Sequence, residues 1–498
     1  MKMNRPYSLI IGLFAICGNL GFSQSISYDD FFNRSTTFYN QKKEKAKESY
    51  NSFREKANQD YAEFLKKAWG NYSAFAPLPK PKEEEPVPPL PYGGPIEEEP
   101  IAVVPTPVRP IEPGPRPVPI EPIKMSPRPA DQPFGFRFYG LDESVRMPKA
   151  LSLNLGRPTN EKVADGWKVL SAGAVDNALN DLLAIRDKYK LSDWAYVQLL
   201  INFSKQFYPE SSQSNNAIFL AAYLFCQSGY QMRLGVNGSD LVMLFSSRHN
   251  IFDWPYYVID GLTVYPMEKV MGQLQICNAA FDGEKPLSLY IDSEQNLGES
   301  LSSERLIESL KYRDLAVWSQ VPMQLIDFYN TYPTSAVGGD IMTRWAMYAE
   351  TPLAEKSRKA LYPALRKSIE NCTKLEAANK LLNWVQTGFE YEYDDKVWGH
   401  DRAFFAEESL YYPFCDCEDR SILFSRLVRD LLGLDVALIY YPGHLATAVR
   451  FDSDVKGDAM IIDGQRFTVC DPTYIGAPVG AQMPGLDYDR TQAIVLNR

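Results

Sequence analysis

Cysteine, histidine and positive charge are all scarce in this chain of 498 residues. It contains seven cysteines and three histidines, and its 52 basic residues are outnumbered by 62 acidic ones, which gives a net charge of −10. This negative charge gives no electrostatic support to a nucleic-acid partner. The sparse cysteines do not read as a disulfide framework, because a chain of this size needs none to fold.

Long apolar runs and nucleotide-binding motifs are missing as well. Beyond the N-terminus no apolar stretch is long enough to span a bilayer, so we expect no transmembrane helix. No glycine-rich phosphate loop or dinucleotide fingerprint is present, and we expect neither a cofactor nor a metal. The length and the hydrophobic content of 45% are those of a folded chain with two or three domains.

The N-terminus has the pattern of an export signal. Basic residues precede an apolar stretch over residues 8–17, and a cleavage point follows residue 23. A lipid anchor at Cys17 is the less favoured alternative, because a lipoprotein signal needs a small residue where Ile16 stands. We predict an exported protein that is periplasmic or extracellular.

Two segments of unusual composition follow the signal. Residues 29–69 carry apolar residues at steps of three and four, which predicts a helix that either packs on its own protein or docks a partner. Residues 77–133 hold 20 of the 36 prolines. Because proline fixes φ and lacks an N–H donor, we expect this segment to form neither helix nor sheet and to act as an extended linker without chemistry.

The rest of the chain alternates between helical and strand-like patterns. Helical periodicity is found at residues 176–189, 194–207, 217–227, 303–310, 354–362, 375–387 and 418–432. Strand-like runs are found at 231–236, 241–245, 256–265, 287–291, 315–319, 436–441, 445–451, 460–462 and 467–470. Asp463-Gly464 predicts a hairpin turn between the last two strands. Helices followed by antiparallel strands predict an α+β fold.

Cys417 stands at the start of the helix predicted over residues 418–432. The unpaired N–H groups and the dipole of a first helical turn stabilise a thiolate, so this cysteine is a candidate nucleophile. The neighbouring acids Asp416, Glu418 and Asp419 partly oppose that effect, although they also suit a helix N-terminus.

A nucleophilic cysteine needs a base that a third group orients. His444 opens a predicted strand, and Asp471 closes the strand after the hairpin. In an antiparallel sheet such residues can lie at the same end, facing the start of the Cys417 helix. The sequence therefore predicts that cysteine, histidine and aspartate meet at one site.

These three motifs together resemble the transglutaminase-like superfamily, over about the last 180 residues. The similarity lies in the Asp-Cys-Glu-Asp-Arg-Ser segment around Cys417, the Gly-His pair at His444 and the Asp-Pro-Thr segment at Asp471. It implies a papain-like fold in which Cys417 is the nucleophile, His444 the base and Asp471 the orienting carboxylate. The chain departs from the family at Cys415, where a glycine is common, which leaves the local turn in doubt.

Other candidates are weighed against structural roles. Trp398 and Gln386 are candidates for the upstream side-chain donor that the family uses to bind the oxyanion. Cys415 and Cys470 are candidate redox partners, although a packing role is favoured. A zinc site drawn from cysteines and histidines near the predicted site, His400 included, fits no known spacing. His249 is expected on the surface or in a loop.

The first globular region shows an echo of the second. When Gly229 is laid on Gly433 without gaps, Gln213 falls on Cys417 and Asp240 falls on His444. With a gap, residues 257–260 match residues 468–471. The alternatives are a chance similarity and a degenerate copy that lacks the nucleophile and the base.

We therefore predict six regions. They are a signal peptide (1–23), a helical segment (24–75), a proline-rich linker (76–133), a degenerate transglutaminase-like domain (134–265), a connecting β/α region (266–317) and a catalytic domain (318–498). The predicted function is acyl transfer at amides of a protein or peptide substrate, with hydrolysis through a cysteine thioester. The alternatives are a cross-linking transglutaminase and an inactive secreted binding protein.

Overall fold

A computed structural model describes residues 42, 53–81, 84–94, 99–119, 128 and 130–497. Residues 57–498 form one compact unit, which is mixed α+β with antiparallel sheets, as the sequence patterns predicted. The predicted signal peptide and most of the predicted N-terminal helix lie outside the described residues. In the part of the chain that is described, no helix combines the length and the apolar character needed to cross a membrane.

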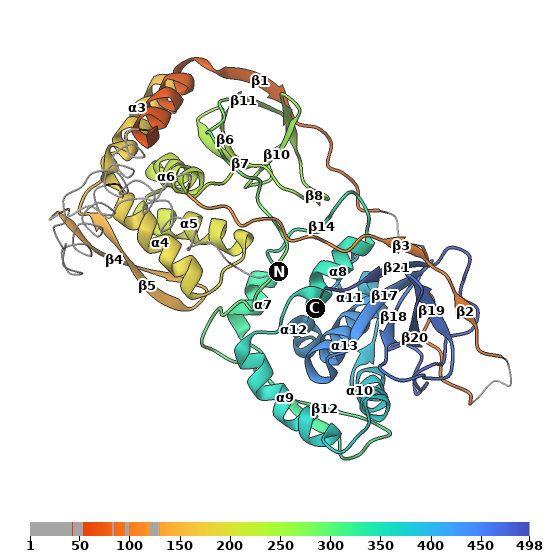
Figure 1. Cartoon of the computed structure of the whole chain (residues 1–498). Helices are drawn as coiled ribbons and strands as arrows, with labels where there is room; N and C mark the ends of the chain where they lie inside the picture. The colour runs from red at the N-terminus through yellow and green to blue at the C-terminus, as the bar shows by residue number, and fades with distance from the viewer. Residues whose placement is uncertain are drawn as a thin grey trace, which may run out of the picture. The chain divides into compact units, whose positions relative to one another are not determined.

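The first half of the unit is built on a six-stranded sheet (Figure 1). Its strand order is β1 (Trp69–Ser73), β11 (Gln273–Cys277), β6 (Met232–Asn237), β7 (Asp240–Phe245), β10 (Leu262–Pro266) and β9 (Tyr257–Ile259). Helix α6 (Ser214–Gln227) packs on β6 and β7, and α5 (Asp193–Phe207) packs on α6. Further elements of this half are the hairpin β4 (Asp131–Phe138) and β5 (Leu141–Pro148), then α3 (Asn160–Val169), η1 (Leu170–Ala174), α4 (Asp176–Lys188), η2 (Ser211–Gln213) and β8 (Asn250–Ile251).

The second half is built on a seven-stranded sheet (Figure 1). Its order is β2 (Ala102–Val103), β19 (Ala459–Ile462), β20 (Gln465–Cys470), β18 (His444–Arg450), β17 (Asp435–Tyr441), β21 (Gln492–Val495) and β3 (Thr106–Val108). The other elements are β12 (Arg305–Glu308), β13 (Ala316–Ser319), α7 (Met323–Tyr329), β14 (Ser335–Ala336), α8 (Met342–Glu350), α9 (Glu355–Ile369), α10 (Lys374–Gly388), β15 (Glu390–Tyr391), α11 (Asp394–Val397), α12 (Ala406–Tyr411), β16 (Phe414–Cys415) and α13 (Cys417–Leu432).

Helix α13 lies at the centre of the second half, packed between α10 and strands β17 and β18. Asp416 caps its first turn by accepting from the N–H of Asp419, whose carboxylate accepts from the N–H of Asp416 in return. Gly433 ends the helix in the left-handed conformation, with φ of 64°. Local sequence signals at both ends therefore determine where the predicted nucleophile stands.

The two sheets share one strand order. Five consecutive strands of the first sheet, β11-β6-β7-β10-β9, correspond in order to β21-β17-β18-β20-β19 of the second. The registers agree as well, since Leu244 pairs with Pro266 where Ala448 pairs with Val469. Both final hairpins turn through an Asp-Gly pair with positive φ, at residues 260–261 and 463–464.

This register corrects one part of the sequence comparison. Residues 257–259 form β9, which occupies the place of β19 and not of β20. Asp260 therefore corresponds to the turn residue Asp463 and not to Asp471. Glu268 stands eight residues after Asp260, as Asp471 stands eight residues after Asp463, so Glu268 occupies the place of Asp471.

The proline-rich segment does join a sheet, so the expectation that it would form none is wrong. β2 pairs with β19 and β3 pairs with β21, both in parallel. Each lies at an edge of the sheet. An edge strand needs hydrogen bonds on one side only, and there proline can be accommodated.

Other sequence predictions need correction. Residues 303–310, predicted as a helix, contain the strand β12, which pairs with β13. Residues 256–265 form two strands because the chain reverses at Asp260-Gly261. In the run at 287–291 only an isolated bridge from Leu287 to Ser247 forms. The predicted domain limits at 134 and 318 fall inside β4 and β13.

Residues 53–67 are helical, and the part from residue 57 packs on its own protein. The ring centroids of Tyr61 and of Trp167 in α3 are 4.5 Å apart. Asn58 accepts from the indole N–H of Trp167 at 2.9 Å and exchanges hydrogen bonds with the Gln227 amide at 3.2 Å. A buried polar cluster therefore ties this helix to α3 and α6.

The substitution Asn58→Leu tests this cluster. It keeps the volume but leaves the indole N–H of Trp167 and the amide of Gln227 without their partner, and this should lower the free energy of unfolding by about 1–3 kcal/mol. Urea unfolding measures the loss. Gln59→Leu, at the exposed next position of the same helix, should change stability by less than about 0.5 kcal/mol. Equal effects of the two substitutions would contradict the assignment.

Candidate active site

His444 is positioned by a tight hairpin between β17 and β18. Tyr441 pairs with His444 across the two-residue turn, in which Gly443 has a φ of 78°. The imidazole is almost fully buried, with 1% of the residue exposed. Its Nε2 lies 2.9 Å from Oδ2 of Asp471, which immediately follows β20.

Asp471 is held rigidly by its own turn. Its Oδ1 accepts from the backbone N–H groups of Thr473 at 2.8 Å and Tyr474 at 3.2 Å. Oδ2 is thereby aimed at His444. Because an ionised carboxylate can only accept, the imidazole must donate from Nε2, and Nδ1 then carries the lone pair. Within the described residues, Nδ1 is buried without a hydrogen-bond partner.

Cys417 meets the same cavity as His444. It is the first residue of α13, and a cavity of about 550 Å³ is lined by both side chains. Leu445, the residue after His444, lines the same cavity. Ser421 Oγ donates to the carbonyl of Leu445 at 3.0 Å and so fixes the helix against β18. The structure therefore brings the three predicted residues into one site.

The thiol of Cys417 is the resting form. Burial raises its pKa well above the ordinary value, and the carboxylates of Glu418 and Asp416 raise it further. The sulfur also donates to Glu418 Oε2 at 3.3 Å. Desolvation and the two adjacent acids oppose the expected stabilisation of the thiolate by the first helical turn. A base must therefore take the proton before the sulfur can react.

The cavity is strongly acidic. Its carboxylate-bearing residues are Glu84, Glu85, Asp394, Asp395, Asp401, Asp416 and Glu418, and it contains one lysine, Lys396. Burial raises the pKa of Asp394 to about 6. Asp401 is instead paired with Arg344 at 2.6 Å, and this arginine with Lys80 holds the pKa of Asp401 below its ordinary value despite burial. The lining therefore favours cationic or neutral groups over acidic ones.

Two groups of side chains in the cavity have atoms within metal-binding reach of one another. Asp416, Cys417 and Glu418 form one group, and Asp394, Asp401 and Glu418 form the other, with ligand atoms within 4.8 Å. Asp394 and Asp416 already accept from backbone N–H groups, Asp401 pairs with Arg344, and Glu418 accepts from the thiol of Cys417. The zinc ligands considered from the sequence do not gather, since His400 is exposed and contacts the carbonyl of Trp398 at 3.0 Å.

Neither sequence candidate for the oxyanion donor lies in the cavity lining. Gln386 is committed to structure, because its Nε2 donates to the carbonyls of Asp471, Tyr474 and Ala477 at 2.8–3.1 Å. Trp398 packs against Phe404 and Tyr412, with the Arg402 guanidinium 4.3 Å from its ring centroid. Gln386 instead clamps the loop that carries Asp471.

Trp345 is a cavity residue with an unpaired donor that the sequence did not single out. It lies on α8, lines the cavity and is 2% exposed. Its ring packs on Tyr440 with centroids 5.4 Å apart, and within the described residues its indole Nε1 is buried without a hydrogen-bond partner. A buried donor without an acceptor is costly, which marks it as a group awaiting a ligand. No local motif distinguishes it from the other seven tryptophans.

The remaining cysteines and histidine have structural surroundings. Cys415 and Cys470 are free thiols. Cys415, in β16, accepts from Arg420 Nε at 3.4 Å, and Cys470 faces the carbonyl of Thr468 at 3.6 Å. Their proposed redox pairing stays a prediction. His249 is not on the surface as expected, because it is 3% exposed, and burial lowers its pKa to about 3.

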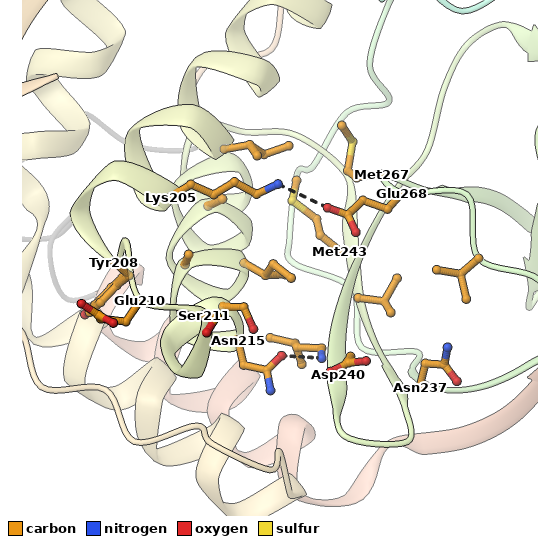
Figure 2. A pocket seen from close by; sticks show the side chains of 18 of the residues that line it. Lys205, Tyr208, Glu210, Ser211, Asn215, Asn237, Asp240, Met243, Met267 and Glu268 are labelled. Atoms are coloured by element: carbon orange, nitrogen blue, oxygen red, sulfur yellow. Dashed lines mark hydrogen bonds and ion pairs between the residues drawn. The ribbon is translucent and has the colours of Figure 1, made fainter. Parts of the chain in front are cut away.

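A second cavity, of about 590 Å³, occupies the corresponding place on the first sheet (Figure 2). Asp240, at the place of His444, and Glu268, at the place of Asp471, both line it. Lys205 pairs with Glu268 at 3.3 Å. Gln213, at the place of Cys417, precedes α6. These side chains provide no thiol and no imidazole, so the cavity lacks the groups for the same chemistry.

The acidic cavity predicts a pH dependence of stability. Folding raises the pKa of Asp394 from its ordinary 3.8 to about 6, so the folded protein binds a proton that unfolding releases. The contribution of Asp394 to stability should fall as the pH rises from about 4 to about 6, by at most about 3 kcal/mol. Asp394→Asn should flatten this slope in urea unfolding measured at stepped pH. Asp395→Asn, at the exposed next position, should retain it, and an unchanged slope in Asp394→Asn would contradict the assignment.

Comparisons with known proteins identify no relative of this chain. No protein-family model matches it, and neither a curated protein nor a solved structure does. The chemistry assigned to the cavity therefore rests on its own geometry.

Proposed function

We propose that this protein is a transglutaminase-like cysteine enzyme with a papain-like core, which performs acyl transfer at amides and most readily hydrolyses them. The observation that carries the proposal is the oriented imidazole of His444. Its Nε2 is hydrogen-bonded to Asp471, and its Nδ1 has no hydrogen-bond partner among the described residues. His444 lines the same cavity as Cys417. A nucleophile, a base and an orienting carboxylate are the parts that covalent catalysis by cysteine requires.

The proposed reaction begins with the thiol. His444 Nδ1 takes the proton of Cys417, and the thiolate attacks the carbonyl carbon of an amide. The resulting tetrahedral oxyanion collapses as the imidazolium gives its proton to the leaving amine, which leaves a thioester on Cys417. Water, deprotonated by His444, then attacks the thioester, and the carboxylic acid departs as the sulfur regains the proton.

Trp345 is the proposed side-chain donor to the oxyanion. Trp345 lines the cavity that Cys417 lines, and its indole N–H has no hydrogen-bond partner among the described residues. A fixed donor is most effective where negative charge develops in a water-poor site, because it needs no reorganisation during the reaction. This places Trp345 in the role that the sequence had offered to Trp398 and Gln386.

Cross-linking is the second candidate, and one observation favours it. The cavity lining has seven carboxylate-bearing residues and one lysine. Such a lining attracts a primary ammonium group, which could replace water as the acceptor of the acyl group after losing a proton. The products separate the two outcomes. A glutamine-rich protein incubated with a fluorescent primary amine becomes labelled by transfer, while hydrolysis releases ammonia or new termini without labelling.

The proposed mechanism predicts how the reactivity of Cys417 depends on His444. Because burial and two acids disfavour its thiolate, His444 should be required to activate it near pH 7. His444→Ala should lower the rate of iodoacetamide alkylation at Cys417 by about tenfold or more. Without the base the thiol is harder to deprotonate, and each unit in the pKa of the thiol changes the thiolate fraction tenfold. Mass spectrometry of the alkylated peptides gives the rate.

Cys372, a half-buried free cysteine outside the cavity lining, is the internal reference. Its alkylation rate should be the same in both proteins. A binding protein on this scaffold would instead show an alkylation rate of Cys417 that His444→Ala leaves unchanged. That result would end the enzymatic proposal.

The second prediction separates Trp345 from the nucleophile. Trp345→Phe keeps the ring packing on Tyr440 but removes the N–H donor, so it should lower kcat for amide turnover by about 10²–10³-fold. Alkylation of Cys417 builds no oxyanion and should be nearly unchanged. Trp398→Phe is the matched control and should retain turnover. Full turnover in Trp345→Phe would remove this residue from the mechanism.

A further inference from the structure

Part of the proline-rich segment lies at the candidate active site itself. Residues 84–92, here called the strap, begin with Glu84, Glu85 and Pro86, which form part of the wall of the cavity that Cys417 and His444 line. The carbonyl of Glu85 rests on Gly443, where a Cβ would come within 2.2 Å of its oxygen. Glycine next to His444 therefore permits this close approach of a second backbone.

Backbone hydrogen bonds hold the strap along the edge of the site. The N–H of Val87 donates to the carbonyl of Gly443 at 2.9 Å. Further along, Ile475 donates to the carbonyl of Leu90 and accepts from the N–H of Tyr92, both at 2.9 Å. These bonds would be available to any extended chain, since they involve no side chain of the strap.

Apolar side chains of the strap add to the backbone contacts. Val87, Leu90 and Tyr92 are partly buried against the smaller hydrophobic cluster of the second sheet. Tyr92 also meets the ring of Tyr474 edge-on, at 5.4 Å between centroids. The strap thus occupies a groove that supplies both backbone partners and apolar contacts.

The charge of the strap does not suit the cavity. Glu84 is paired with Arg490 at 2.6 Å on the exposed side, yet Glu84 and Glu85 stand beside five other carboxylates of the lining. Like charges at such a site repel one another. Apart from the pair of Glu84 with Arg490, the strap is therefore held by its backbone and apolar contacts, and its glutamates carry charge of the same sign as most of the lining, which suits a segment that a better ligand can displace.

We propose that the strap fills, in cis, the groove in which this enzyme binds an extended peptide substrate, and that it blocks acyl transfer until it is displaced. The inference rests on the proposed function, because it assigns the groove to the site of Cys417. The substrate class that fits is an extended peptide with apolar residues where Val87 and Leu90 lie. At the positions that Glu84 and Glu85 occupy, the substrate peptide should carry neutral or basic side chains.

Loosening the strap tests the blocking. The loosened variant is Val87→Pro, which removes the backbone donor to Gly443 within an already proline-rich sequence. It should raise the rate at which a polyethylene-glycol maleimide labels Cys417 by about fivefold, the factor that loss of one backbone hydrogen bond allows. Val104→Pro, at a position that is 77% exposed, is the matched control and should leave the rate unchanged.

Two synthetic peptides test the substrate class. One has the sequence of residues 81–94, and the other carries lysine in place of Glu83, Glu84 and Glu85. In the loosened variant both should protect Cys417 from iodoacetamide, and the lysine peptide should do so at a concentration at least about tenfold lower. Added salt should narrow that difference.

The outcomes are distinct. Unchanged maleimide labelling in the loosened variant would overturn the blocking, and absence of protection by either peptide would overturn the peptide groove. Stronger protection by the acidic peptide would overturn the assigned charge preference. If the maleimide rate rises while His444→Ala leaves alkylation unchanged, the strap stands and the proposed function fails.

Discussion

The hydrogen bond between His444 and Asp471 is the interaction on which the rest of the site depends. Both residues are buried, and an isolated carboxylate in such surroundings would be strongly destabilised. Asp471 is compensated by two backbone N–H groups and the imidazole, and Gln386 fixes the carbonyls of the same loop. This buried polar network holds the imidazole of His444 in a single orientation, with its lone pair on Nδ1. Packing alone would not require such a network.

How far the sequence could predict this site follows from where each signal lies. The caps of α13 and the two-residue hairpin turns are local, so the places of Cys417, His444 and Asp471 could be predicted from neighbouring residues. The proposed role of Trp345 could not be predicted in this way. It depends on a contact between α8 and the sheet, and no residue next to Trp345 in the sequence indicates that contact. The strand β12 was missed for a related reason, since its pairing with β13 overrode a helical pattern.

The proline-rich segment shows a different failure. Its composition correctly excluded internal strands but said nothing about edges, where a chain needs hydrogen bonds on one side only. The partners of the strap, Gly443 and Ile475, lie more than 350 residues further along the chain. Composition describes what a segment cannot form with itself, and it does not predict which surface the segment meets.

The two sheets agree in strand order, in register and in the positions of both Asp-Gly turns, while a duplicated core stays a prediction. With Asp240 and Glu268 at the places of His444 and Asp471, the first sheet has two carboxylates where the second has a base and its orienting acid. Lys205 offsets one of those charges. The cavity on the first sheet has neither a thiol nor an imidazole among its lining residues, so it is suited to binding or support.

Under the proposed function, the acidity of the cavity connects substrate binding with activation. Burial, and then Glu418 and Asp416, raise the pKa of Cys417, and burial also raises the pKa of Asp416 itself, so that the remaining acidic residues of the lining attract positive charge into the cavity. A cationic group bound beside them offsets their field and therefore lowers the pKa of the thiol, since a nearby positive charge favours the thiolate. An acidic occupant such as the strap has the opposite effect. If the proposed function and the proposed role of the strap hold, the acidic lining disfavours the thiolate while the strap is bound and disfavours it less when a basic peptide takes its place.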